Sequence, residues 1–392
     1  MSRRLQRDAV VVGGSVVGTA CALALADSGL QVALVDAGAP ARWSRDTADL
    51  RVFAFAPDNA ALLSALGVWD DVAASRAQPY RRMRVWDAAA GGELVFDADA
   101  LARRELGWIV EQNLLAEKLG NGARRVGVEL LQPARIEGME TREAGVRLRL
   151  EGGETLDARI AIAADGANSK LRELAGIAID ARDYGQRGVV AYVETAEPHQ
   201  LTAWQRFLPG GPLAFLPVDG DRRSSIVWSL PADEAERMLA LDDAAFGIEL
   251  TNAFAGRLGD TRVLSKRAAF PLRRQLAKTQ LAGRVLVLGD AAHVVHPLAG
   301  QGLNLGLADV AALARVIAER EAWRGLGDEL LLRRYERERA GATAAMAWVT
   351  DGLLQLFAQP QPLLRELRNR GMTLLNHLPP VKRLLTARAL DL

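Results

Sequence analysis

The chain has 392 residues, of which 49% are hydrophobic and 25% charged, with a mean hydropathy of +0.02. This ordinary globular composition excludes disordered, collagen-like and disulfide-scaffold proteins, and the length suggests two or three structural units. Lys and Arg number 49 against 48 Asp and Glu, so the chain lacks the basic excess of a nucleic-acid-binding protein. The single cysteine, Cys21, excludes an internal disulfide and a Cys-based zinc site. We expect Cys21 to be a small buried hydrophobe.

An uncharged apolar run, Ala9–Ala26, follows Arg3, Arg4 and Arg7 and has the pattern of a signal peptide or a short membrane span. Glycines interrupt this run at a spacing that a nucleotide-binding turn explains better. Elsewhere, charged residues break every apolar stretch before it reaches spanning length. We therefore expect no targeting segment and a cytoplasmic protein.

The first elements in chain order are predicted to form a βαβ unit. Ala9–Val12 is expected to be a buried strand, Thr19–Ser28 a helix closed by Gly29, and Gln31–Asp36 a second strand. A parallel sheet therefore begins with the first structured residues. A further helix is predicted over Asp58–Leu66.

The middle of the chain alternates with a period of two, which is typical of strands. One hairpin is predicted from Arg82–Trp86 and Glu93–Phe96, and another from Gly145–Leu150 and Thr155–Ile160, each around a glycine-containing turn. A helix over Leu114–Leu119 lies between the two hairpins.

A strand-rich region follows, punctuated by proline and glycine. Its predicted strands are Gly188–Glu194, Trp204–Leu208, Leu213–Leu216, Ser225–Leu230 and Ser265–Phe270. An apolar strand, Arg284–Leu288, then begins a block that becomes helical after Gly302. The simplest description is an α/β nucleotide-binding body, interrupted by a mostly antiparallel β insert and followed by a helical tail after about residue 345.

A glycine-rich turn, Gly13-Gly14-Ser15-Val16-Val17-Gly18, joins the first predicted strand to the first helix. Gly13 permits a tight turn, position 15 lets the backbone approach a pyrophosphate, and Gly18 lets the helix pack on the strand. Asp36 ends the second strand, where a carboxylate can accept a hydrogen bond from a ribose hydroxyl. The alternative is a purely structural turn with a solvated Asp36. The nucleotide interpretation is favoured, but this turn alone does not separate NAD from FAD.

Two further motifs follow predicted strands. The first is Ile162-Ala163-Ala164-Asp165-Gly166-Ala167-Asn168-Ser169-Lys170-Leu171-Arg172. The second is Val287-Leu288-Gly289-Asp290-Ala291-Ala292-His293, continued by His296-Pro297-Leu298-Ala299-Gly300-Gln301-Gly302-Leu303-Asn304-Leu305-Gly306. Asp290 at a strand end can bind a ribityl or ribose hydroxyl. The turn at 300–302 opens a helix whose N-terminus could stabilise negative charge on a reduced flavin.

Together these three motifs resemble the FAD-dependent aromatic hydroxylases of the para-hydroxybenzoate-hydroxylase fold, the group A flavoprotein monooxygenases. The run from His296 to Gly306 is similar in particular to the ubiquinone-biosynthesis hydroxylases. Asp49–Ala54, Leu213–Pro217, Thr350–Leu353 and the segment 375–383 support this narrower resemblance.

The resemblance implies a set of FAD contacts. The pyrophosphate would meet Gly13, Ser15 and Gly18, and the adenosine ribose would meet Asp36. Arg51 would lie near the flavin and its phosphates, Gln112 at the ribityl chain, and Asp290 at the ribityl or pyrophosphate end. Asp165 and Gly166 would meet both FAD and pyridine nucleotide. The isoalloxazine ring would be lined by Pro297, Gly300, Gln301, Gly302, Leu303 and Asn304. Pro297, Gly300 and Gly302 would form the loop where oxygen reacts, with no protein nucleophile. Two departures are Ser15, where glycine is usual, and Asp36, where glutamate is common.

The resemblance also implies a fold and a reaction. We expect an α/β protein whose Rossmann-like, glutathione-reductase-type FAD domain carries an inserted, mostly antiparallel substrate domain. The expected boundaries are 1–72, 104–182 and 271–345 for the FAD domain, 73–103 and 183–270 for the β domain, and 346–392 for a C-terminal helical segment. NAD(P)H or another reductant would reduce FAD, O2 would add at flavin C4a, and the hydroperoxide would hydroxylate the ring of a prenylated phenolic ubiquinone precursor. A related flavin-dependent reductase and a non-catalytic scaffold of a biosynthetic complex are the alternatives.

Several residues remain open on the sequence alone. The aromatic side chains of the β insert, foremost Tyr192, Phe215 and Trp228, could line a substrate pocket or belong to the core. His293 and His296 lack the carboxylate cluster of a metal site, so we expect them to shape a loop and expect no metal. The basic, leucine-containing segment 365–392 could meet a membrane surface or other ubiquinone-pathway proteins, or it could pack on its own domain.

Overall fold

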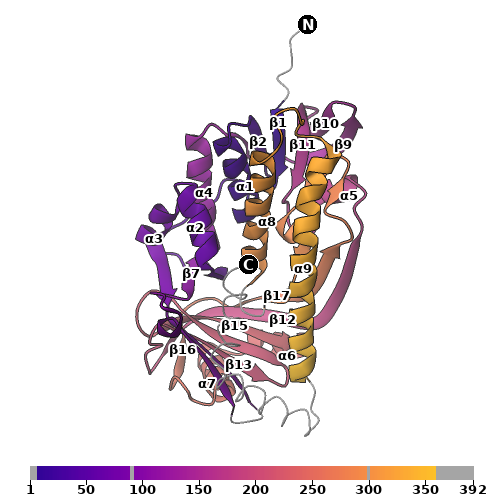
Figure 1. Ribbon diagram of the computed structural model, residues 1–392. Helices are drawn as coiled ribbons and strands as arrows, with labels where there is room; N and C mark the ends of the chain where they lie inside the picture. Colours follow the sequence, from indigo (N-terminus) through magenta and orange to yellow (C-terminus); the bar gives the residue numbers. More distant parts are fainter. Residues whose placement is uncertain (1–6, 89–91, 298–300, 359–392) are drawn as a thin grey trace.

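The apolar opening of the chain folds as the predicted βαβ unit (Figure 1). The computed structural model describes residues 7–88, 92–297 and 301–358. Strand β1 (Arg7–Val12) leads through α1 (Val16–Asp27) to β2 (Val32–Val35), and the two strands pair in parallel with Ala9 opposite Val32. The apolar run therefore forms a central strand of a sheet and the helix that follows it. Within the described part of the chain, no helix has the length and hydropathy needed to cross a bilayer.

The first sheet has its strands in the order β18-β19-β11-β1-β2-β8, and a hairpin of β9 and β10 extends from β11. β11 pairs in parallel with both β1 and β19, which brings segments far apart in the chain together. The other strands of this first sheet are β8 (Glu129–Leu131), β9 (Ile136–Arg142), β10 (Gly145–Leu150), β11 (Thr155–Ala163), β18 (Leu281–Ala282) and β19 (Val285–Val287). Helix α5 (Lys170–Leu174) follows β11.

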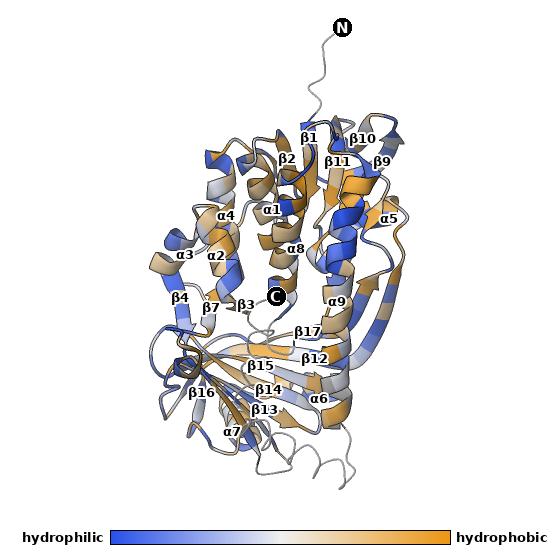
Figure 2. Ribbon diagram, viewed as in Figure 1, coloured by the Kyte–Doolittle hydropathy of each residue, from blue (hydrophilic) through white to orange (hydrophobic). Residues whose placement is uncertain are grey.

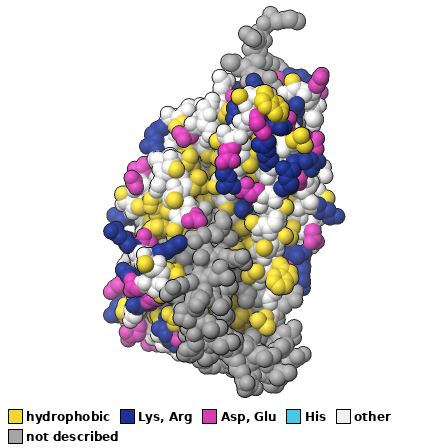
Figure 3. All heavy atoms as spheres, in the orientation of Figure 1, with side chains coloured by type: hydrophobic (Ala, Val, Ile, Leu, Met, Phe, Trp, Pro, Cys, Tyr) yellow, Lys and Arg dark blue, Asp and Glu magenta, His cyan; other side chains and the backbone are white. Residues whose placement is uncertain are grey.

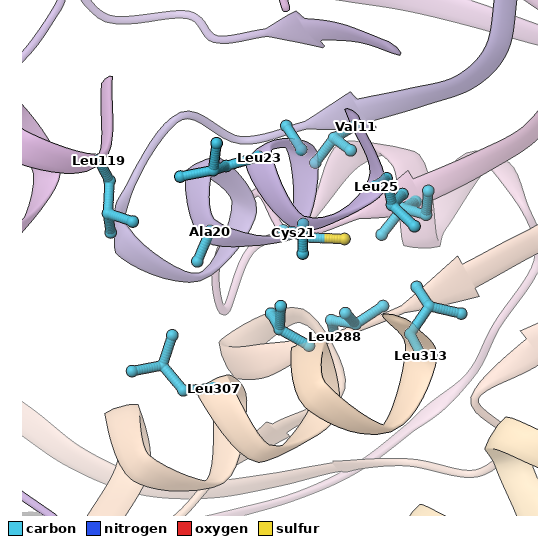
Figure 4. Close-up of a cluster of buried hydrophobic side chains, with 14 of the residues drawn as sticks. Val11, Ala20, Cys21, Leu23, Leu25, Leu119, Leu288, Leu307 and Leu313 are labelled. Atoms are coloured by element: carbon cyan, nitrogen blue, oxygen red, sulfur yellow. The ribbon is translucent and has the colours of Figure 1, made fainter. Parts of the chain in front are cut away.

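Helices α1, α4 (Gln112–Arg125) and α8 (Gln301–Ala318) cover one face of this sheet and bury the main hydrophobic core (Figure 4). Cys21 lies inside this core at 1% exposure, as predicted. Burial raises the pKa of its thiol to about 12, so the thiol stays protonated at neutral pH. Cys21 therefore acts as a small apolar side chain.

The second sheet has its strands in the order β20-β17-β12-β15-β14-β13-β5-β6, with β16 paired to β12. Its strands are β5 (Arg82–Asp87), β6 (Glu93–Asp97), β12 (Ile179–Thr195), β13 (Thr202–Leu208), β14 (Gly211–Pro217), β15 (Arg223–Pro231), β16 (Thr261–Val263), β17 (Ala268–Ala277) and β20 (His293–Val294). Helices α6 (Ala232–Ala240) and α7 (Asp243–Ala253) cover the face that lies away from the first sheet.

A small sheet in the order β3-β7-β4 lies beside α2 (Pro57–Ala65) and α3 (Trp69–Arg76). Its strands are β3 (Val52–Phe55), β4 (Ala77–Tyr80) and β7 (Gly107–Glu111), and the short 3-10 turns η1 (Asp99–Leu101) and η2 (Gly289–Ala291) complete the elements outside the helices. We did not predict this sheet, because its short strands carry no clear alternation and pair only through distant contacts.

The long helix α9 (Glu329–Ala358) runs along the side of both sheets (Figure 1). Figure 2 shows its N-terminal half as mainly hydrophilic and the remainder as pale to hydrophobic. Trp348 and Val349 are 79% and 45% exposed on the latter part, and Figure 3 shows hydrophobic side chains over this region. The helix passes without a break through residue 345, where the tail was expected to begin.

Most predicted elements are confirmed, including both hairpins. The strand predicted over Ser265–Phe270 is wrong in its position, because β17 begins at Ala268 and continues to Ala277. Helices α6 and α7 were missed inside the strand-rich region. The predicted fold class is confirmed, whereas the domain boundaries remain a prediction.

We expect Phe215→Ala to lower the free energy of unfolding by about 3–5 kcal/mol, because its ring is fully buried against α6 and α7. Leu216→Ala is the matched control, since Leu216 is the next residue of β14 and only partly buried. Its loss should stay below about 2 kcal/mol. Urea titration of both variants measures the difference, and an equal or larger loss for Leu216→Ala would contradict the assigned faces.

Candidate functional site

A cavity of about 610 Å³ lies at the carboxyl ends of β1, β2 and β11, and residues after β19 also line it. Ligands of open α/β sheets bind at this edge. The predicted FAD residues that line the cavity are Gly13, Ser15, Asp36, Arg51, Gln112, Asp165, Gly166, Asp290 and Leu303. The tertiary structure therefore brings together residues from seven separate stretches of the chain.

The glycine turn forms the floor of the cavity. Gly13 has a φ of +112°, and a Cβ there would overlap the carbonyl oxygen of Ala164. A Cβ on Gly18 would overlap the carbonyl oxygen of Gly13. Ser15 precedes α1 in an extended conformation, and its hydroxyl does not cap the helix. The Ser15 hydroxyl and the first N–H groups of α1 are therefore available to an anionic ligand.

Asp36 follows β2, and its carboxylate accepts hydrogen bonds from Gly14 N at 2.5 Å and Gly38 N at 2.7 Å. These bonds orient the carboxylate at the cavity wall while leaving its other lone pairs free for a hydroxyl donor. Asp36 is therefore not a wholly solvated strand end, which was the alternative interpretation. Asp36 also supports the glycine turn.

Arg51 and Gln112 lie side by side on the opposite wall, with Arg51 Nη1 donating to Gln112 Oε1 at 3.3 Å. The Asp49 carboxylate accepts from Arg51 N at 3.0 Å and from Asn113 N at 2.8 Å. Asp49 therefore joins the segment that carries Arg51 to the start of α4. The Arg51 guanidinium is exposed towards the cavity and places a positive charge there.

Asp290 lines the cavity, and its carboxylate makes no hydrogen bond within the described ranges. Burial raises its pKa, while His293, Arg51 and Arg273 oppose that shift. A carboxylate in this state is a strong acceptor for a ligand hydroxyl.

Behind Asp290, the fully buried carboxylate of Asp309 holds the turn in place. It accepts from His293 Nε2 at 2.7 Å, Arg339 Nε at 2.7 Å and Gly289 N at 3.0 Å. The expected loop-shaping role of His293 agrees with this geometry. Arg339 and Asp309 were missed in the sequence, because charged residues on long helices usually face solvent.

The Asp165 carboxylate accepts hydrogen bonds mainly from groups of the protein itself. It accepts from the Ser169 hydroxyl, from Lys170 N at 2.7 Å and from Leu171 N at 3.1 Å, which secures the start of α5. Arg172 donates to Ala291 O at 2.9 Å and so connects this motif to the Asp290 turn. Arg172 belongs to the motif that begins at Ile162, but the sequence did not predict this contact.

The predicted flavin-ring loop is described in part, since Gly300 lies outside the described residues. Pro297 is partly buried, and Gln301 and Asn304 are buried. Asn304 accepts from Ala56 N at 3.2 Å and donates to Ala54 O at 2.9 Å. Its side chain therefore fastens α8 to β3 and α2 and does not line the cavity. Gly302 is the second residue of α8 and has open space where a Cβ would be.

The second sheet presents Tyr192 to the cofactor side, where its hydroxyl donates to Asp49 O at 3.1 Å. Phe215 and Trp228 lie on the opposite face, at 0% and 4% exposure, in the core beneath α6 and α7. The structure therefore does not support these two residues as substrate-facing. The strand period of two separates them from Tyr192, and the sequence alone does not show which face is covered.

His296 is fully buried, and neither ring nitrogen has a hydrogen-bond partner within the described ranges. Its ring lies edge-on to Tyr184, with the centroids 5.3 Å apart. Burial lowers its pKa to about 4, so the imidazole is neutral at physiological pH. No group of three His, Cys, Asp or Glu side chains suited to a metal ion occurs in the described part of the chain.

Comparison with known proteins places this site in a family. The family model for the FAD binding domain matches residues 6–349. The ubiquinone hydroxylase UbiL of Rhodospirillum rubrum is 36% identical over 98% of this chain and 89% of its own length. The 3-demethoxyubiquinol 3-hydroxylase of Escherichia coli is 35% identical over 92% of this chain and 93% of its own length. The p-nitrophenol 4-monooxygenase PnpA of Pseudomonas putida shares the fold, with a TM-score of 0.78 at 21% identity over 97% of this chain and 96% of that one.

The chain is thus a flavoprotein of the FAD binding domain family, an FAD-dependent monooxygenase by class. More narrowly, it belongs to the family that contains the ubiquinone hydroxylases. The cavity fits FAD on its own evidence. Gly13, which lines the cavity, and Gly18 in α1 have no room for a Cβ, the Ser15 hydroxyl does not cap α1, and the Asp290 carboxylate lacks a partner within the described ranges.

We expect the free energy of unfolding of the FAD-free protein to fall as the pH rises above about 6.5 and through the folded-state pKa of His293. Burial lowers the pKa of His293, but Asp309 outweighs it, and the net pKa lies above 6.5. The folded chain therefore holds a proton that the unfolded chain releases near pH 6.5, and the stabilisation is lost as the pH rises through the folded-state pKa.

Urea titrations across this pH range test the expectation. His293→Gln should flatten the slope. His199→Gln should not flatten the slope, because burial lowers the pKa of His199 and its own contribution changes with pH in the opposite sense. A slope that persists in His293→Gln would assign the pH dependence to another group.

Proposed function

We propose that this monooxygenase hydroxylates the aromatic ring of a prenylated phenolic precursor of ubiquinone, with NAD(P)H as the source of electrons and O2 as co-substrate. The observation that carries the proposal is the juxtaposition of the FAD cavity with one face of the second sheet, where Tyr192 reaches Asp49. The names of the relatives supply the substrate class.

When bound, FAD supplies the redox chemistry and the activation of oxygen. Gly13, Ser15 and the N-terminus of α1 would hold its pyrophosphate, and Arg51 would offset its negative charge. Asp290 and Gln112 would hold the ribityl chain, and Asp36 the adenosine ribose. Pro297 and the start of α8 would meet the ring, where a helix N-terminus favours negative charge.

The sheet face on the cofactor side suits a phenol with an apolar chain. Val190, Leu216 and Val227 share this face with Tyr192, as the strand register shows. A second cavity of about 160 Å³ is lined on one side by apolar residues, among them Phe207 and Leu208, and also by the charged Arg182 and Asp351. The ring of Phe207 stacks on Phe357 of α9 with the centroids 3.8 Å apart. An apolar surface at this position would exclude water from the reacting ring.

The proposal extends to the surroundings of the enzyme. We infer a cytoplasmic protein that contacts the inner surface of the membrane through 365–392 and meets other proteins of the ubiquinone pathway. This segment lies outside the described residues. What supports the inference is its sequence, in which leucines alternate with basic residues, together with the apolar substrate.

An absorption spectrum of the purified protein, recorded before and after FAD addition, tests the cofactor. We expect a flavin band at near-stoichiometric occupancy. Incubation with NAD(P)H, O2 and a short-chain prenylated phenol should then yield a product heavier by one oxygen atom. Saturation of a double bond would support a flavin-dependent reductase, and a protein that binds no FAD would support the scaffold alternative.

Asp290→Ala should weaken FAD binding by about 10- to 100-fold, the effect of losing one charge-assisted hydrogen bond. Asp233→Ala is the control, because Asp233 lies in the first turn of α6 on the far side of the second sheet. Fluorescence titration with FAD measures both dissociation constants. An Asp290→Ala variant with unchanged affinity would remove Asp290 from the cofactor site.

A further inference from the structure

Glu111 ends β7 immediately before Gln112, and its side chain is 5% exposed. Its carboxylate accepts from Trp43 Nε1 at 2.6 Å, from Asp49 N at 3.1 Å and from both Nε and Nη2 of Arg76, at 3.0 and 2.8 Å. The Tyr192 hydroxyl lies 3.4 Å from the same carboxylate. One buried carboxylate therefore gathers donors from α3, from the segment between β2 and β3, and from the second sheet.

The segment that these donors hold has no helix or strand of its own. Residues 37–51 connect β2 to β3 and end at Arg51. Glu111 holds this segment at Trp43 and Asp49, and it orients Arg76, whose Nη1 donates to Arg45 O at 2.9 Å. Without a regular backbone ladder, the position of the segment depends on such side-chain contacts.

The charge on Glu111 is matched by one arginine. Arg76 forms the ion pair and also lies over the ring of Trp43, 5.2 Å from its centroid. Removing the carboxylate charge would leave the Arg76 guanidinium and the Trp43 indole N–H with a weaker hydrogen-bond acceptor in a buried place. Because these bonds are buried, weakening them would disturb the whole cluster. This cluster adjoins two residues of the cavity wall. Asp49 accepts a hydrogen bond from Arg51 N, and Gln112 directly follows Glu111 in the chain.

We propose that Glu111 is a positioning residue for the cofactor, which fixes the segment 37–51 so that Arg51 faces FAD beside Gln112. Tyr192 connects this arrangement to the substrate-facing side of the second sheet. The inference rests on the proposed function in one respect, since it takes Arg51 to face the bound cofactor.

A double-mutant cycle on the FAD dissociation constant tests the proposal. Glu111→Gln keeps the shape of the side chain and removes the charge. Alone, it should weaken FAD binding by about 10-fold or more. In an Arg51→Ala background, its further effect should fall below about 2-fold, because the residue through which it acts is gone.

Glu93→Gln is the matched control. Glu93 is also a partly buried glutamate with two arginine partners, Arg84 and Arg257, but it lies in the second sheet away from the cofactor cavity. Its variant should bind FAD with the affinity of the unmodified chain. If Glu111→Gln does not fold, Trp43→Phe removes a single donor to the same carboxylate and should weaken FAD binding by a few-fold, again only when Arg51 is present.

The outcomes distinguish failure of the proposed function from failure of the positioning role of Glu111. If the unmodified chain binds no FAD, the proposed function fails. If it binds FAD and Glu111→Gln binds FAD equally well, the positioning role of Glu111 is wrong while the function stands. Equal losses with and without Arg51 would also overturn the role, because they indicate a general loss of stability.

Discussion

The close approach of three backbone segments at Gly13 is the constraint on which the cofactor site depends. The end of β1, the start of α1 and the end of β11 meet where a Cβ at Gly13 or Gly18 would overlap a carbonyl oxygen. Because β1 pairs in parallel with β2 and β11, and β11 with β19, the carboxyl ends of these strands lie at one edge. The motifs that follow the strands are therefore neighbours, although those after β2, β11 and β19 lie more than a hundred residues from one another in the chain.

Two buried carboxylates stabilise the walls of this site from behind. Asp309 holds the turn that presents Asp290, and Glu111 holds the segment that presents Arg51. Each is paired with an arginine, Arg339 in one case and Arg76 in the other. Breaking such a pair by removing one partner leaves an uncompensated buried charge, which costs about 3–5 kcal/mol. Both carboxylates therefore link the local shape of the cavity to the stability of the fold.

The second sheet shows how the strand period decides what a residue can do. Tyr192 and Phe215 are aromatic residues of the same sheet. The Tyr192 hydroxyl donates to Asp49 O, whereas Phe215 is buried beneath α6 and α7. The alternation of each strand was visible in the sequence. The identity of the covered face was not, because α6 and α7 lie between strands in a region that was predicted to be strand-rich.

The sequence by itself determined the βαβ opening, the glycine turn, the two hairpins and the residues of the cofactor motifs. These features are local, since a turn, a helix end or an alternating strand depends on residues close together in the chain. Only the tertiary structure decided that Asn304 fastens α8 to β3, that Phe215 is core, and that Glu111 and Asp309 are buried. Those outcomes depend on which distant segments pack against one another, and no short stretch of sequence contains that information.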